Sequence, residues 1–253
     1  MGQAKAQQPA QVDAANALTP HGSDADTENG IEMVESSGEL MTQSVDDAVD
    51  LDEIQDYLVT DDNVCRGFIP EEFEPTVEPY RLYRFLTDLD DVLAAEPDDA
   101  KRVQLITPMV RSLLISSDWL QFEYTDPSPK TGWAVRMLYR EPSFPLTVQM
   151  VSWQPGKVST VHNHATWGIV ALIRGREKNT FWRRSPTPDH PDRIEKVGEQ
   201  ILVPGDVIGF TPGAIHCVEA LDDEPTISFN LYGVTNYAQR FQFDVEAHTA
   251  KQF

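Results

Sequence analysis

The chain has 253 residues, enough for one domain whose core excludes water. It is strongly acidic, with 41 Asp and Glu against 20 Lys and Arg and a formal net charge of −21, which argues against a nucleic acid or an anionic membrane surface as partner. Two cysteines form no disulfide framework, and neither a secretory signal nor an apolar stretch of roughly 20 residues is present, so we expect a soluble, cytoplasmic protein.

The first 65 residues differ in composition from the rest of the chain. They contain 15 acidic residues and one basic residue, Lys5, among Gln, Ala, Ser, Thr and Gly. Such a segment cannot bury enough apolar surface to offset the entropy lost on ordering, so residues 1–65 are predicted to be an acidic, disordered tail. Residues 45–59 hold a few apolar side chains and could instead form a short amphipathic helix or a docking segment. The folded domain is predicted over residues 66–253.

A helical pattern begins at Pro79. Apolar residues recur there at three- and four-residue steps, which predicts a helix with one apolar face formed by Tyr80, Tyr83, Leu86, Leu89 and Leu93. Asp98 or Asp99 is suited to cap a second helix, whose apolar positions are Val103, Ile106, Val110, Leu113 and Leu114. Pro108 inside this run predicts a kink or a break. The two helices, over about residues 79–117, are expected to cap one end of the domain.

After Trp119 the pattern changes to short runs rich in Val, Ile, Phe, Tyr and Trp, separated by turns with Pro and Gly. About nine strands at this spacing predict a β-barrel or sandwich over about residues 119–246. The expected strands are 133–139, 146–153, 168–173, 178–183, 199–203, 207–211, 216–220, 227–232 and 240–245.

The segment from Gly156 to His164 is the most informative in the chain. A glycine turn leads into a predicted strand that carries His162 and His164, two residues apart. Because side chains alternate along a strand, both imidazoles lie on one face and can reach the same metal ion. A lone buried histidine is more often a core residue, but this paired spacing indicates metal ligands.

A second segment, from Gly205 to His216, has a similar design. A glycine turn, a short apolar run and the turn at Pro212 and Gly213 precede the third histidine. His216 thus completes a possible set of three ligands. The remaining histidines, His21, His190 and His248, show no such spacing.

The two segments resemble the paired motif of the cupin superfamily, whose fold is a double-stranded β-helix, a jelly-roll-like barrel. In the family motif a Glu stands where this chain has Gly168, and Pro and Asn stand where it has Thr211 and Ala220. The resemblance implies a mainly β fold in which the barrel follows two α-helices. It also implies a metal ion bound by His162, His164 and His216.

The identity of the metal is not decided by the ligand count. Three histidines can hold a catalytic Zn²⁺ together with its water. Without the carboxylate, however, the ligand set is neutral, and it can let Fe²⁺ accept an anionic thiolate and O₂ together without excess negative charge.

A second resemblance is more specific. The segment from Trp153 to Gly175 is similar to the metal-site segment of the cysteine dioxygenase family, which includes bacterial 3-mercaptopropionate dioxygenases. The likeness covers roughly residues 80–245 and is strongest in the His-x-His element and the Trp-Gly pair at Trp167. It implies Fe(2+) as cofactor and a small thiol and O₂ as substrates, with Trp167 among the substrate-binding residues.

The same family has a strand with the pattern Ser-x-His-x-Tyr, whose tyrosine hydroxyl points at the iron. Ser228, Asn230 and Tyr232 match it, with Asn230 in place of the histidine. The three residues alternate along a strand and therefore share one face. The resemblance implies catalytic roles for them, but an asparagine cannot hold a positive charge, so proton transfer through Asn230 is in doubt.

An arginine is expected to bind the carboxylate of the substrate, because its planar guanidinium pairs bidentately with that group. In cysteine dioxygenases it precedes the strand leading to the first motif, a place that Arg136 matches. In the mercaptopropionate branch it follows the tyrosine strand, close to the place of Arg240. The spacing of Arg136 needs no gap, which favours it slightly.

Two other functions are compatible with the same residues. One is a three-histidine dioxygenase that acts on a chelating substrate without a thiol, such as a β-diketone. The other is a metal-binding cupin without turnover that acts as a sensor or binding module, for which Asn230 and Ala220 leave room.

Overall fold

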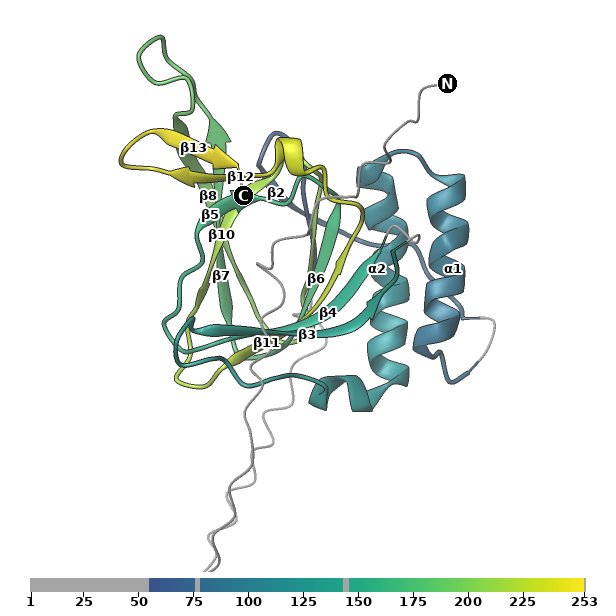
Figure 1. Ribbon diagram of the computed structural model, residues 1–253. Coiled ribbons are helices and arrows are strands. Elements are labelled where there is room, and N and C mark those ends of the chain that lie inside the picture. Colours follow the sequence, from purple (N-terminus) through teal and green to yellow (C-terminus); the bar gives the residue numbers. More distant parts are fainter. Residues whose placement is uncertain (1–54, 76–77, 143–145, 253) are drawn as a thin grey trace, which may run out of the picture. The chain divides into compact units, whose positions relative to one another are not determined.

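The computed structural model describes residues 55–75, 78–142 and 146–252, all of which belong to one compact unit, Val49–Phe253. Two β-sheets face each other and enclose the interior of a barrel (Figure 1). The mainly β, jelly-roll-like double-stranded β-helix predicted from the sequence is confirmed. None of the helices in this part of the chain is long and apolar enough to cross a membrane.

The first sheet has seven strands and the second has six. In spatial order the first contains β2 (Cys65–Phe68), β1 (Asp56–Val59), β9 (Val207–Phe210), β6 (Gly168–Arg174), β11 (Thr226–Tyr232), β4 (Thr147–Trp153) and β3 (Trp133–Arg140). The second contains β13 (Thr249–Gln252), β12 (Phe241–Asp244), β5 (Val161–Asn163), β10 (Ile215–Ala220), β7 (Glu177–Arg184) and β8 (Ile194–Leu202).

All nine expected strands are present, although β8 begins five residues before the predicted start at 199. Three strands were not expected: β1, β2 and β13. Strand β5 was expected from the glycine turn before the paired histidines, although its three residues are too few for an alternating pattern to identify it. It carries His162, and His164 follows directly after its last residue, Asn163.

The two predicted helices are α1 (Leu82–Ala95) and α2 (Asp99–Ser116). Asp98 caps α2 as expected, since its side chain accepts a hydrogen bond from the backbone N–H of Lys101 at 2.9 Å. The helix continues through Pro108, so the expected break is absent. Tyr83 is 66% exposed, so the predicted apolar face of α1 is also wrong at that position.

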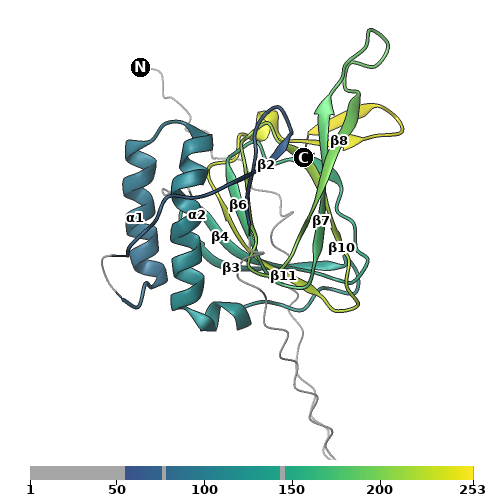
Figure 2. The ribbon, with the colours of Figure 1, turned by 180° about the vertical axis from the view of Figure 1, so that it is seen from behind.

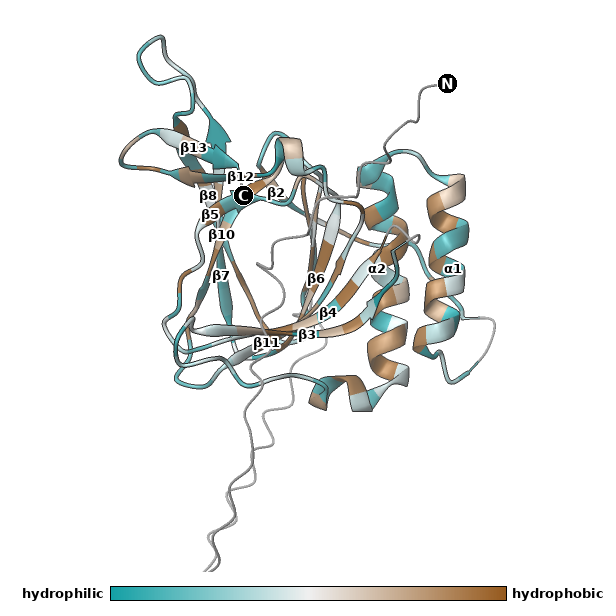
Figure 3. Ribbon diagram, in the orientation of Figure 1, coloured by the Kyte–Doolittle hydropathy of each residue, from teal (hydrophilic) through white to brown (hydrophobic). Residues whose placement is uncertain are grey.

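The helices lie against the outer face of the seven-stranded sheet instead of capping an end of the barrel (Figures 1 and 2). Helix α2 crosses β9 closely, because a Cβ on Gly209 would come within 2.0 Å of Val103 Cγ1. Figure 3 shows hydrophobic residues along both helices and along the strands beside them. This outer core contains Phe85, Leu89, Met150 and Phe229, whereas a second core inside the barrel contains Val170 and Phe181.

The boundary predicted at residue 65 is wrong, because β1 and the start of β2 fall within the expected tail. Strand β1 pairs in parallel with β9, and both Leu58 and Val59 are buried. Asp56 forms an ion pair with Arg111 of α2. These residues form a strand because the backbone of β9 has a free edge with which they pair, and because α2 packs against one face of β1. Residues 1–54, including most of the possible docking segment, lie outside the described residues.

This arrangement predicts that removal of residues 1–65 destabilises the protein. Burial of Leu58 and Val59 contributes about 1.5–3 kcal/mol each, so the free energy of unfolding should fall by at least about 3 kcal/mol. Urea unfolding of the shortened chain measures the loss, and a chain that lacks only residues 1–54 is the control. Equal stability of the two shortened chains would contradict the structural role of β1.

Candidate metal centre

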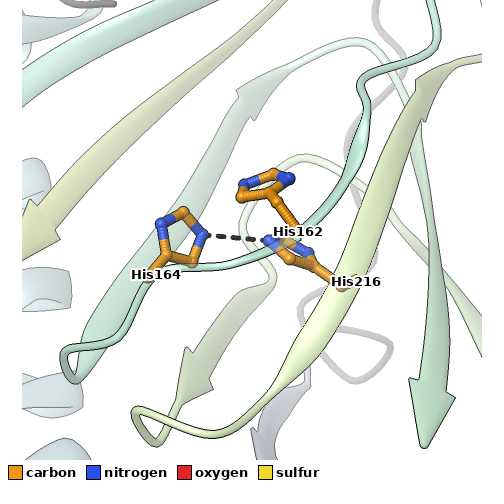
Figure 4. Close-up of side chains that lie close together, drawn as sticks. All are labelled: His162, His164 and His216. Carbon is orange, nitrogen blue, oxygen red and sulfur yellow. Dashed lines mark hydrogen bonds between the residues drawn. The ribbon is translucent and has the colours of Figure 1, made fainter. Parts of the chain in front are cut away.

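Three histidines from two neighbouring strands lie close together in the barrel. His162 is in β5, His164 follows directly after that strand, and His216 is in β10. Strands β5 and β10 pair so that His162 and His216 are direct cross-strand neighbours. Figure 4 shows the three imidazole rings turned toward a common point. The predicted ligands are therefore brought together by strand pairing.

The distances suit one metal ion. One nitrogen from each histidine lies within 4.8 Å of the other two, and the Nε2 atoms of His164 and His216 are 3.0 Å apart. Two nitrogen ligands bound at about 2.1 Å and at right angles to each other lie about 3.0 Å apart. A divalent transition metal therefore fits this set of side chains.

Hydrogen bonds to the far side of two rings fix which nitrogen can bind a metal. His162 Nδ1 donates to the carbonyl oxygen of Thr160 at 2.8 Å, and His216 Nδ1 donates to Asn179 Oδ1 at 2.9 Å. A carbonyl oxygen only accepts, so Nδ1 carries the proton and Nε2 carries the lone pair. Partners of this kind orient metal-bound histidines and increase their basicity.

The three imidazoles are neutral at physiological pH. Burial lowers the pKa of His162 to about 4, and nearby Arg240 makes a smaller contribution in the same direction. Burial also holds the pKa values of His164 and His216 well below the usual range, with a further effect of charge on the neighbouring histidines. Neutral imidazole is the form that binds metals, so the three side chains can bind a cation without first losing a proton.

Tyr232 lies with its ring over Gly168, the position at which the cupin motif has a Glu. Its ring stacks on His164, with the ring centroids 4.7 Å apart and an angle of 28° between the planes. Gly168 lies directly beneath it, and a Cβ at that position would come within 2.6 Å of Tyr232 Cδ1. The glycine in place of the Glu thus has a steric reason, because any side chain there would displace the tyrosine ring.

This contact predicts the effect of a minimal change, Gly168→Ala. Overpacking of a buried site typically costs about 1–3 kcal/mol, and Tyr232 must rotate away from His164 to relieve the clash. Thermal unfolding measures the cost, and a second variant that also carries Tyr232→Ala should recover most of the stability lost through the clash. Gly156→Ala is a control for the added methyl group, since nothing lies within 4 Å of a Cβ there, although its positive φ adds some strain.

Ser228, Asn230 and Tyr232 share one face of β11, as predicted, and they form a chain of hydrogen bonds. Asn230 Nδ2 donates to Ser228 Oγ at 2.9 Å and to the Ser228 carbonyl oxygen at 3.1 Å. Its Oδ1 must therefore accept, and the Tyr232 hydroxyl donates to it at 2.9 Å. Burial raises the pKa of Tyr232, which keeps the hydroxyl protonated at neutral pH.

The structure places only one of the two candidate arginines beside the histidines. Arg240 is half-buried and lies two residues before Gln242, which pairs with His162, so alternation along the extended chain directs Arg240 to the face of the histidines. In agreement with this place, its charge acts to lower the pKa values of His162, His164 and Tyr232. Burial lowers the pKa of Arg240 itself, but a guanidinium stays charged. Of the two candidate arginines, Arg240 is therefore the one on the side of the histidine cluster.

Arg136 points away from the site, so the preference for it is corrected. In the sheet it pairs with Met150, which pairs in turn with Phe229 in the core beneath the helices. Cross-strand neighbours share a face, so Arg136 lies on the opposite face of the sheet from Asn230. It is 53% exposed and forms an ion pair with Glu123 at 2.9 Å.

Trp167 also has a different place from the one implied by the resemblance. It is buried in the core beneath the helices with Ile169 and Ala171, and not among the histidines. Its indole packs so tightly on Gly233 that a Cβ there would come within 2.4 Å of Trp167 Nε1. The assignment of Trp167 to substrate binding is thus replaced by a role in packing.

Two residues of the site were not identified from the sequence. Asn179 of β7 orients His216, and Asn163 stands between the two first ligands and binds backbone groups of two other segments. Asn179 carries no local signal, because it reaches His216 only through the pairing of β7 with β10. Asn163 could have been noticed, since a polar residue that alternates with ligands must face the other side of the strand.

Comparisons with known proteins add little to this geometry. No protein-family model matches the chain. Among solved structures, an oxalate oxidase aligns at 12% identity and a TM-score of 0.34, covering 46% of this chain and 57% of its own. A cupin superfamily protein from Desulfitobacterium hafniense aligns at 14% and 0.31, covering 40% and 77%. A double-stranded β-helix protein from Klebsiella pneumoniae aligns at 18% and 0.35, covering 46% and 88%. At TM-scores this low, none of these matches bears on the function of the chain.

Proposed function

We propose that the protein is a non-haem Fe(II) dioxygenase that oxidises a small thiol bearing a carboxylate to its sulfinate. The observation that carries the proposal is a neutral cluster of three histidines with Tyr232 stacked on one of them and Arg240 beside it. The reaction is RSH + O₂ → RSO₂H. Both oxygen atoms end on sulfur, which supplies all the electrons that O₂ takes up, so no external reductant is needed.

The donor set is compatible with iron and supports the proposal through its charge. Three neutral imidazoles leave the full positive charge of a divalent ion available to an anionic substrate. The chemistry that bound Fe(II) would supply is the joint activation of a thiolate and O₂ for addition of both oxygen atoms to sulfur. The resemblance of the segment from Trp153 to Gly175 to thiol dioxygenases favours this use over other three-histidine sites.

The residues around the histidines would bind and orient the substrate. Arg240 would pair with the carboxylate, which the net charge of −21 would otherwise repel from the protein. The Tyr232 hydroxyl, held by Asn230, would fix the orientation of the reacting group. Asn230 can pass on a hydrogen bond but holds no extra proton, so the thiol proton leaves by another route.

Oxygen consumption by iron-loaded protein tests this function. The protein is loaded with Fe(II) without air and then mixed with a panel of thiols, a β-diketone and buffer alone. We expect O₂ uptake only with thiols, fastest with a mercapto acid, and one sulfinate formed per O₂ consumed. Uptake with the diketone alone would assign the site to a chelating substrate. No uptake by protein with full iron content would favour a binding module or sensor.

A further inference from the structure

Asn163 stands between two of the histidines and faces the other way. It follows His162 and precedes His164, so alternation along the strand directs its side chain to the opposite face. It is 7% exposed. A polar side chain this deeply buried needs hydrogen-bond partners, and the partners of Asn163 show which segments it connects.

The three hydrogen bonds of this side chain reach two distant segments. Its Nδ2 donates to the carbonyl oxygen of Gln239 at 2.9 Å, and its Oδ1 accepts from the N–H of Phe241 at 2.8 Å. These two residues flank Arg240. The same Nδ2 donates to the carbonyl oxygen of Pro212 at 3.3 Å, in the turn that leads to His216.

These hydrogen bonds connect the strand of His162 with the segment around Arg240, where strand pairing has not yet begun. Arg240 follows a short 3₁₀ helix, η3 (Tyr237–Gln239), and only at Gln242 does the chain pair with His162 in β5. Before that point, Asn163 holds the backbone on both sides of Arg240. A long side chain such as arginine loses much rotational entropy on binding, so a fixed backbone lowers the cost of placing its guanidinium.

The amide is suited to this task in a way that its isostere is not. One carbonyl oxygen and one N–H from the segment around Arg240 require a donor and an acceptor on the same side chain. Aspartate has the same shape but would place a carboxylate oxygen against the carbonyls of Gln239 and Pro212. Both contacts would then be repulsive, whereas the bond from Phe241 would remain.

We propose that Asn163 is a positioning residue that holds Arg240 beside the histidine cluster and thereby gives the site its preference for thiols with a carboxylate. This inference rests on the proposed function for its substrate, but the position of the segment can be measured without any substrate. The two parts of the test are therefore separate.

The first measurement is hydrogen exchange in the metal-loaded protein without a thiol. In Asn163→Ala the amide of Phe241 loses its acceptor, and we expect it to exchange at least about tenfold faster, while amides in β6 and β11 stay protected. Metal content and the unfolding temperature are measured on the same samples to confirm a folded, loaded protein. Unchanged exchange at Phe241 would overturn the proposal, whether or not any thiol binds.

The second measurement is thiol binding to Co(II)-loaded protein, followed by the thiolate-to-metal absorption. A three-carbon mercapto acid should bind about tenfold more weakly to Asn163→Asp and to Asn163→Ala, since the loss of a charge-assisted contact has this size. An aminothiol without a carboxylate should bind within about twofold of the unchanged protein. Equal weakening for both thiols would overturn the proposed preference, because it would show a general effect on the metal.

Two controls complete the design. Asn236→Asp introduces the same charge in the same segment at an exposed position, where its side-chain oxygen can still accept from the N–H of Ala238, and it should leave both affinities unchanged. In an Arg240→Ala background, Asn163→Asp should not weaken mercapto-acid binding further, because the two residues act through one contact. Additive losses would contradict the proposal. If the unchanged protein binds no thiol, the proposed function fails, and hydrogen exchange alone decides the role of Asn163.

Discussion

Replacement of His162, His164 or His216 by alanine is expected to remove most of the bound iron in each case. The three side chains converge within 4.8 Å, and each supplies one nitrogen, so two remaining ligands cannot hold the ion against water. Iron content per chain after anaerobic loading and desalting measures the loss. Full iron retention by any one variant would exclude that histidine from the site.

Two further variants should lose less iron than the three histidine variants. His190→Ala should keep its iron, because His190 lies in an exposed loop against His248. Asn179→Ala should weaken metal binding about tenfold to a hundredfold, since loss of the partner that orients a ligand usually has this effect. A loss as complete as that of the histidine variants would mean that Asn179 supports the fold of the barrel and not only one ring.

Metal binding should also depend on pH in a defined direction. Protons compete with the metal for Nε2, and the folded protein lowers the pKa of His162 from 6.5 to about 4. The site should therefore retain iron at pH 6, where free imidazole is largely protonated, and lose it as the pH falls toward about 4. A titration of bound metal between these values measures the midpoint, and loss already near pH 6.5 would contradict the burial of the ligands.

Arg240→Ala is expected to lower kcat/KM for a mercapto acid about tenfold to a hundredfold or more. A charge-assisted hydrogen bond contributes roughly 1.5–3 kcal/mol. Without the guanidinium, no local positive charge would offset the repulsion between the acidic protein and the anionic substrate. The effect should be much smaller for a simple aminothiol, which offers no carboxylate. Steady-state kinetics with both substrates measure the selectivity, and iron content confirms that the site remains loaded.

Arg136→Ala is the matched control for this prediction. Its side chain lies on the other face of the sheet in an ion pair with Glu123, so it should change neither substrate's kinetics beyond the small effect of an exposed ion pair. A substrate-selective loss from Arg136→Ala and none from Arg240→Ala would reverse the assignment. Small, equal effects from both changes on every thiol would contradict binding of the carboxylate by an arginine.

The sequence by itself predicted the three histidines that the structure brings together and the class of fold. His162 lies in β5 and His164 directly after it, and this spacing of two residues places both rings on one face whatever the strand pairs with. The alternating runs after residue 119 likewise predicted nine strands that the structure contains. Both conclusions depend only on short-range geometry, which a single segment of chain carries in its own pattern.

Only the tertiary structure decided which residues surround those ligands. Spacing slightly favoured Arg136 over Arg240, but the register of β3 with β4 turns Arg136 away from the site, and the hydrogen bonds of Asn163 hold the backbone around Arg240. Strand β1 belongs to an acidic stretch with few apolar residues, yet it is ordered by the edge of β9 and by Arg111. Register and edge pairing join segments far apart in the sequence, and a shift of one residue exchanges the two faces of a strand. For that reason the ligands follow from local spacing, whereas the residues that would choose a substrate follow from how the strands assemble.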